Sequence, residues 1–184
     1  MTRPSTRALL PAAVLAAGAL LAACGGEQPV ASPGERPTPP DTAAATAVEL
    51  PAEPKPERDG PCPYLETKFV AEANGQKVGT VKVSADKPHP TCFFTGLDGK
   101  EQLRSRVYVG DPGVARELVD QAAPVSESSK AELTGGWKGG RMPTSNGSVF
   151  AVAKDGKAVV ITSNQETTFK AQRIAQKVIA KLGL

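Results

Sequence analysis

The first 24 residues most constrain what this chain can fold into, because they decide which part remains to fold and in which compartment. Arg3 and Arg7 form a short basic region, residues 8–23 are apolar and uncharged, and two alanines precede Cys24. This is the layout of a cleavable signal peptide. The apolar run is shorter than the roughly 20 residues that a membrane-spanning helix needs. We therefore predict that residues 1–23 are a signal peptide and that the rest of the chain is exported.

The end of this segment, Leu21-Ala22-Ala23-Cys24, resembles the bacterial lipobox. The resemblance implies that a diacylglycerol lipid is attached to the Cys24 thiol and that the chain is cleaved before this residue. The expected location is then the outer face of the cell membrane, with the membrane as a partner through the lipid on Cys24. An ordinary signal peptide followed by an incidental cysteine is the alternative.

A proline-rich segment follows the lipidated cysteine. Residues 25–60 contain eight of the 17 prolines, no aromatic residue and no sustained apolar period. Such a composition cannot bury enough apolar surface to offset the entropy of ordering, so we predict that residues 24–60 are a disordered tether. The remaining residues, 61–184, are long enough for a single globular domain.

Two cysteines remain for the folded part, Cys62 and Cys92. In an oxidising compartment an isolated pair is expected to form a disulfide. Redox catalysis is the alternative, but the chain has no Cys-x-x-Cys motif. We therefore predict a structural disulfide between Cys62 and Cys92.

The apolar periodicity of the domain predicts an α+β fold with an antiparallel sheet of about five strands and about three helices packed on it. The strands are expected at 78–85, 91–95, 102–109, 149–153 and 158–162. The helices are expected at 63–73, at 111–124 with Asp111 as the N-cap, and from a capping box at Ser163 to Leu182. The order strand, Asp-Gly-Lys turn, strand, helix occurs twice, which suggests two ββα units.

A basic patch with aromatic residues is the main candidate binding site. Arg104, Arg106 and Tyr108 alternate with apolar residues on one expected strand, and Lys82 takes the same kind of position on another. Arginine can bind a carboxylate or phosphate with two parallel hydrogen bonds. Trp137, flanked by glycines, could contribute a ligand contact or close the edge of the core. The alternative for the charged residues is a solvated strand face.

A second basic surface is expected on the last helix. One stripe carries Lys170, Arg173, Lys177 and Lys181, opposite an apolar stripe that would face the core. On a lipid-anchored protein this stripe could lie on anionic lipid. A solvated face that complements the helix dipole is the alternative.

Catalytic and cofactor motifs are not evident. His89, the single histidine, lies between two prolines, and a serine triad would need a serine and a carboxylate beside it. Zinc sites usually take several Cys or His ligands, which this chain does not offer. We expect no metal and no cofactor. The net charge of +3 is small, and the sequence lacks the dense positive charge that is typical of a nucleic-acid-binding protein.

Several local sequences together resemble an uncharacterised family of actinobacterial secreted lipoproteins. They are the lipobox, the proline-rich tether, Pro61-Cys62-Pro63-Tyr64-Leu65, His89–Phe94, Val107–Pro112, Gly136-Trp137 and the region from Ala151 to Gln165. The chain is more distantly similar to actinobacterial envelope lipoproteins and extracellular sensor domains, in which an N-terminal helix is disulfide-linked to a strand. This resemblance implies helices packed on an antiparallel sheet and ligand capture rather than turnover.

Three functions follow as hypotheses. The first is a non-catalytic cell-envelope lipoprotein that binds an anionic lipid, glycan or peptide through Lys82, Arg104, Arg106, Tyr108 and Trp137. The second is an accessory or scaffold subunit that docks on another envelope protein. The third, less favoured, is a hydrolase that acts on wall material.

Overall fold

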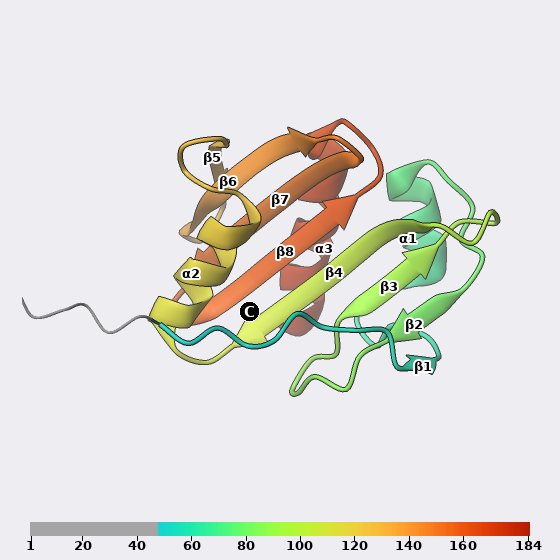
Figure 1. Cartoon of the computed structure of the whole chain (residues 1–184), viewed down its shortest axis with the longest axis horizontal. Coiled ribbons are helices and arrows are strands. Elements are labelled where there is room, and N and C mark those ends of the chain that lie inside the picture. Colours follow the sequence, from blue (N-terminus) through green and yellow to red (C-terminus); the bar gives the residue numbers. More distant parts are fainter. Residues whose placement is uncertain (1–47) are drawn as a thin grey trace, which may run out of the picture. The chain divides into compact units, whose positions relative to one another are not determined.

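The computed structural model describes residues 48–184, which form one antiparallel sheet with three helices (Figure 1). The helices are α1 (Thr67–Asn74), α2 (Pro112–Ala122) and α3 (Thr168–Leu182). The strands are β1 (Arg58–Asp59), β2 (Val81–Val83), β3 (Cys92–Thr95), β4 (Glu101–Val109), β5 (Ser129–Leu133), β6 (Trp137–Thr144), β7 (Gly147–Lys154) and β8 (Lys157–Ser163).

The sheet has eight strands in the order β1-β2-β3-β4-β8-β7-β6-β5, and every neighbouring pair is antiparallel. The expectation of about five strands was therefore wrong, although the class is α+β. The five expected strands correspond to β2, β3, β4, β7 and β8. The three missed strands are β1, β5 and β6, which form the two outer parts of the sheet.

Glycine and proline explain why β6 was missed. This strand contains Gly139, Gly140 and Pro143, residues that normally indicate a loop. A Cβ atom at Gly139 would lie 2.1 Å from the carbonyl oxygen of Ala151, and one at Gly140 would lie 2.8 Å from that of Ala123. These glycines therefore permit the close approach of the neighbouring backbone, and they do not mark a turn.

The two faces of the sheet carry different helices (Figure 1). α1 and α3 cover one face, where apolar residues of β3, β4, β7 and β8 form the larger core with them. α2 covers part of the opposite face through a smaller cluster with β7 and β8. The two strand–strand–helix segments that end in α2 and α3 thus pack their helices on opposite faces, so they are not equivalent halves.

An extended segment lies on the same face as α2. We call residues 48–57 the strap; in Figure 1 it runs past the end of β4 towards β1. Pro54 is buried, and the Glu57 N–H donates to the Val83 carbonyl at 3.1 Å. The sequence places the start of the globular domain at residue 61, whereas in the structure the segment from Pro51 to Gly60 already contacts the sheet.

The disulfide between Cys62 and Cys92 is confirmed. It connects the segment before α1 to β3 across a sequence separation of 30 residues. In the chain-entropy model, closing such a loop stabilises the folded state by about 3–4 kcal/mol.

The start of α3 differs from the expectation. Ser163 ends β8 instead of capping a helix, and its hydroxyl donates to Asn74 Oδ1 at 2.7 Å. The helix begins at Thr168 after Thr167 as N-cap, and it ends at Gly183 in the left-handed conformation. The expected capping box is therefore absent at Ser163, because its side chain instead links β8 to the end of α1.

The predicted signal peptide, the lipidation site Cys24 and the tether as far as residue 47 lie outside the described residues. Within residues 48–184, no helix combines the length and the apolar character needed to cross a membrane.

Candidate functional site

Two arginines of β4 point to the face that carries α2 and the strap. β4 alternates, so that Leu103, Ser105 and Val107 enter the larger core or its edge while Arg104 and Arg106 face the other way. On the neighbouring strand β3, Phe93 is directly opposite Arg104, whose guanidinium carbon lies 5.3 Å from the centre of that ring. The alternation predicted from the sequence thus places both guanidinium groups on one surface.

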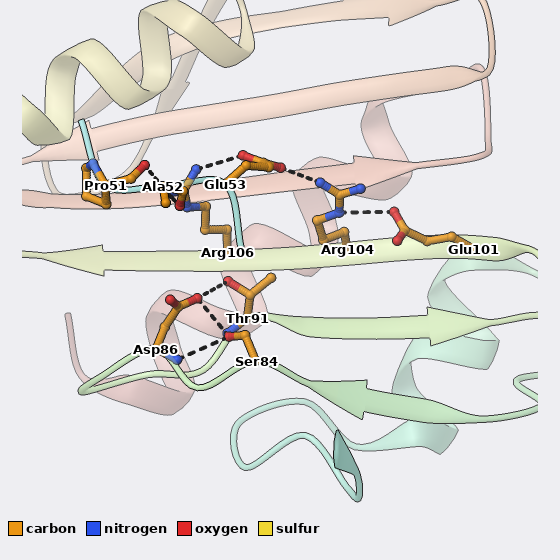
Figure 2. Close-up of polar contacts among 9 residues, drawn as sticks. All are labelled: Pro51, Ala52, Glu53, Ser84, Asp86, Thr91, Glu101, Arg104 and Arg106. Atoms are coloured by element: carbon orange, nitrogen blue, oxygen red, sulfur yellow. Dashed lines mark hydrogen bonds and ion pairs between the residues drawn. The ribbon is translucent and has the colours of Figure 1, made fainter. Parts of the chain in front are cut away.

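The strap binds both guanidinium groups (Figure 2). One carboxylate oxygen of Glu53 accepts from Arg104, and the other accepts from Arg106 Nη1 at 3.1 Å. Arg106 Nη2 donates to the carbonyl oxygens of Pro51 at 3.3 Å and Ala52 at 3.1 Å. Glu53 therefore bridges two charges that the sequence predicted, from a segment that the sequence assigned to the tether.

A groove adjoins this ion-pair cluster. It has a volume of about 380 Å³ and lies between the strap and α2. Arg104, Arg106 and Glu53 line one side. The remaining lining residues come from α2, β7 and β8 and are mainly apolar: Leu118, Gln121, Ala122, Val149, Val160 and Thr162. The groove therefore combines a charged wall, in which Glu53 is paired with the two arginines, with a mainly apolar floor.

Tyr108 lies on the same face but has a structural role at the end of β4. Its hydroxyl accepts a hydrogen bond from the Asp111 N–H at 3.0 Å. A Cβ atom at Gly110 would lie 2.4 Å from that hydroxyl, so the ring folds closely over the turn into α2. Tyr108 is not among the residues that line the groove beside Arg104 and Arg106.

Lys82 and Trp137, the other two candidates, lie away from this groove. Lys82 is on β2, separated from Arg104 by Phe93 of β3, and its Nζ lies 3.7 Å from Asp59 Oδ1. Trp137 is only 2% exposed and belongs to the larger core on the opposite face. Of the five candidates, the structure brings only Arg104 and Arg106 together in a groove.

The basic stripe of α3 partly serves to pack α1 and α3 together. Lys170 Nζ donates to the Asn74 carbonyl at 3.0 Å and to the Gln165 side chain at 2.6 Å. The charged groups of Arg173 and Lys177 lie 5.7 and 5.4 Å from the centre of the Phe69 ring. Lys181 is exposed in the last turn of the helix.

A second groove, which the sequence did not suggest, lies on the other side of α2. It has a volume of about 480 Å³ and is bounded by α2, β6 and the turn between β7 and β8. Its charged residues are of both signs: Arg116, Asp120, Lys138, Lys154 and Asp155. Because these residues come from three separate elements, no single stretch of sequence indicates that they meet.

His89 lies on the loop between β2 and β3. Its ring packs edge-on against Tyr64, with ring centres 6.3 Å apart. The loop that carries it is closed by Asp86, whose carboxylate accepts from the hydroxyls of Ser84 at 2.7 Å and Thr91 at 3.1 Å (Figure 2). Among residues 48–184 no group of three or more His, Cys, Asp or Glu side chains could hold a metal ion.

Residues 47–184 match the family described as Domain of unknown function (DUF2020). The match covers three quarters of the chain and includes the strap as well as the sheet and helices. No curated protein matches the chain. The chain therefore belongs to the DUF2020 family.

Proposed function

We propose that this member of the DUF2020 family is an exported, lipid-anchored protein that binds an amphiphilic anion in the groove between the strap and α2. The anion is a carboxylate or phosphate attached to an apolar chain. The observation that carries the proposal is the juxtaposition of two arginines with an apolar floor in one groove. No reacting group is needed, so the proposed function is capture and not catalysis.

The two arginines of the groove support an anionic ligand. Guanidinium groups bind carboxylates and phosphates through paired, charge-assisted hydrogen bonds. Arg106 is the better placed of the two, because only 14% of its side chain is exposed. Partial burial reduces the screening of its charge by water and so strengthens its attraction for an anion.

The floor supports an apolar chain on that anion. Leu118, Val149 and Val160 line the groove. Val149 belongs to the apolar cluster between α2 and the sheet, and Val160 packs against that cluster. A volume of about 380 Å³ is within the range of pockets that take small organic ligands, roughly 300–1,000 Å³. A short acyl chain matches this groove better than a glycan, whose hydroxyl groups would face apolar side chains.

The cellular setting is part of the proposal. The basic residues Arg3 and Arg7, the apolar run and Cys24 support export and attachment of a lipid to Cys24. Membership of an actinobacterial family of secreted lipoproteins is also part of the proposal, and the local sequences Pro61–Leu65, His89–Phe94 and Val107–Pro112 support it. The binding groove would then be held outside the cell, at the outer face of the membrane.

Calorimetric titration with dodecanoate, below its micelle-forming concentration, tests the proposed site. We expect the wild-type chain to bind dodecanoate. It should not bind dodecyltrimethylammonium, which has the same chain length and the opposite charge. Replacing Arg104→Gln and Arg106→Gln together should weaken binding at least about tenfold, because the charge-assisted contacts are lost.

Arg141→Gln is the matched control, since Arg141 is an exposed arginine on β6. It should bind dodecanoate as the wild type does. Equal affinity in the double variant, with an unchanged melting temperature, would exclude Arg104 and Arg106 as the binding site.

A further inference from the structure

The Glu53 carboxylate occupies the position on the two arginines that an external anion would need. Its two oxygens accept from Arg104 and from Arg106, in the manner of a bound carboxylate ligand (Figure 2). The carbonyl oxygens of Pro51 and Ala52 accept hydrogen bonds from Nη2 of Arg106. The strap thus contacts the site as an extended peptide ligand would.

Five of the ten N–H donors of the two guanidinium groups already donate hydrogen bonds within the protein. Each guanidinium has five N–H groups in a fixed plane. Arg106 gives three hydrogen bonds to the strap, and Arg104 gives one to Glu53 and one to Glu101 at 3.1 Å. A third anion beside Glu53 and Glu101 would place three negative charges against two positive ones. Like charges at such separations repel, so the incoming anion and Glu53 compete for the site.

The N-terminal half of the strap is attached in a way that permits release. The Glu53 side chain is 63% exposed, so water and dissolved anions can reach its carboxylate where it lies on the two arginines. Among the described residues, the first backbone hydrogen bond from the strap to the sheet is the one from Glu57 to Val83. Pro54 is buried, so the strap has a fixed part from Pro54 onward and a part before it held mainly by Arg104 and Arg106.

We infer that Glu53 is a built-in competitor of the Arg104–Arg106 site, which an amphiphilic anion displaces together with the strap before Pro54. This inference rests on the proposed function, because it concerns regulation of the same groove. Displacement exchanges one carboxylate for another on the same guanidinium groups, so the charge balance of the site is preserved. The apparent affinity for the anion is then the intrinsic affinity multiplied by the fraction of molecules in which the strap is released.

The test uses the full chain, dodecanoate as the probe, and the variant Glu53→Gln. Removing the competing charge should tighten dodecanoate binding by about tenfold. Glu49→Gln is the matched control, because Glu49 is an exposed strap residue for which no hydrogen bond or ion pair occurs among the described residues, and its affinity should stay at the wild-type value.

A second readout separates displacement from a simple gain in positive potential. NMR backbone order parameters of Ala52 and Glu53 in the wild type should be near 0.85 without the probe and fall below about 0.6 when dodecanoate saturates the site. Order parameters of β4 should not change.

The outcomes distinguish the two proposals. Binding of equal strength to the wild type and Glu53→Gln, with an ordered strap in both, would overturn the displacement and leave the proposed function in place. If neither the wild type nor Glu53→Gln binds dodecanoate, both the proposed function and the displacement are overturned. Tighter binding by Glu53→Gln together with a released strap in the wild type supports both.

Discussion

At the scale of one residue, Tyr64 connects three segments of the chain through its hydroxyl group. Its side chain is 1% exposed, and the hydroxyl shares its proton between the carbonyl oxygens of Pro90 at 2.8 Å and Ser105 at 2.9 Å. Burial raises the pKa of Tyr64 above its ordinary value, because the phenolate would be poorly solvated inside the protein. The residue therefore stabilises the fold only while it keeps its proton.

Replacing Tyr64→Phe should lower the free energy of unfolding by about 1–2 kcal/mol at neutral pH, because two buried carbonyls lose a donor. The pH dependence should change as well. Above about pH 10 the unfolded chain loses the Tyr64 proton while the folded chain keeps it, so wild-type stability falls as the pH rises. Urea unfolding at neutral and alkaline pH should show a smaller fall for Tyr64→Phe. An equal fall in both proteins would assign the alkaline loss to other groups.

Single residues also mark how far the sequence could predict the site. Strand alternation was sufficient to put Arg104 and Arg106 on one face, because a period of two residues is set by backbone geometry. Glu53 was missed, because it lies among prolines without any apolar period, and only the folded sheet shows which charges it meets. Trp137 could be interpreted either way from its glycine neighbours, and its burial is a tertiary property.

At the scale of an element, α2 is the helix whose start the sequence predicted best. Asp111 precedes Pro112, and its Oδ1 accepts from the N–H groups of Gly113 at 2.7 Å and Val114 at 3.1 Å. This is the geometry expected when an aspartate caps a helix with proline in its first turn. The cap matters for the groove, because α2 forms one of its walls.

Removing the cap by Asp111→Ala should destabilise the protein by about 1 kcal/mol, because two N–H groups at the start of α2 lose their acceptor. Asp111→Asn is the control, since asparagine is a comparably good N-cap. Thermal unfolding of the three proteins checks this expectation. A melting temperature for Asp111→Ala equal to that of the wild type would show that the cap is dispensable.

Strand prediction succeeded where apolar alternation or a continuous apolar run was present and failed elsewhere. The central strands β4, β7 and β8 bury residues on both faces and carry strong patterns. The outer strands lack such patterns: β1 has two exposed residues, and β5 has one buried residue, Ala131. Their pairing is determined by neighbours that are distant in sequence, which local pattern cannot supply.

At the scale of the whole molecule, the sheet has one face closed by α1 and α3 and one face shared by α2 and the strap (Figure 1). The first face is held by a continuous apolar core, whereas the strap is held at Arg104 and Arg106 by charge. Salt should therefore affect the two faces differently.

Raising the salt concentration from about 0.1 M to about 1 M shortens the Debye length from about 10 Å to about 3 Å. We expect NMR order parameters of Ala52 and Glu53 to decrease over this range, because the exposed Glu53 contacts are screened. Residues of β4 and β8 should keep their values, since their order depends on backbone pairing and apolar burial. A strap that stays equally ordered in high salt would mean that the burial of Pro54 alone holds it.

The position of the disulfide has a mechanical consequence. A pull on the chain before residue 48 is borne first by the strap and then by β1, whose two residues pair with β2. Cys62 follows immediately and is covalently joined to Cys92 of β3. Peeling from the N-terminal side therefore stops at this bond, and any further load passes directly into the sheet. The strap and β1 can detach and re-attach under tension while the folded body beyond Cys62 stays intact.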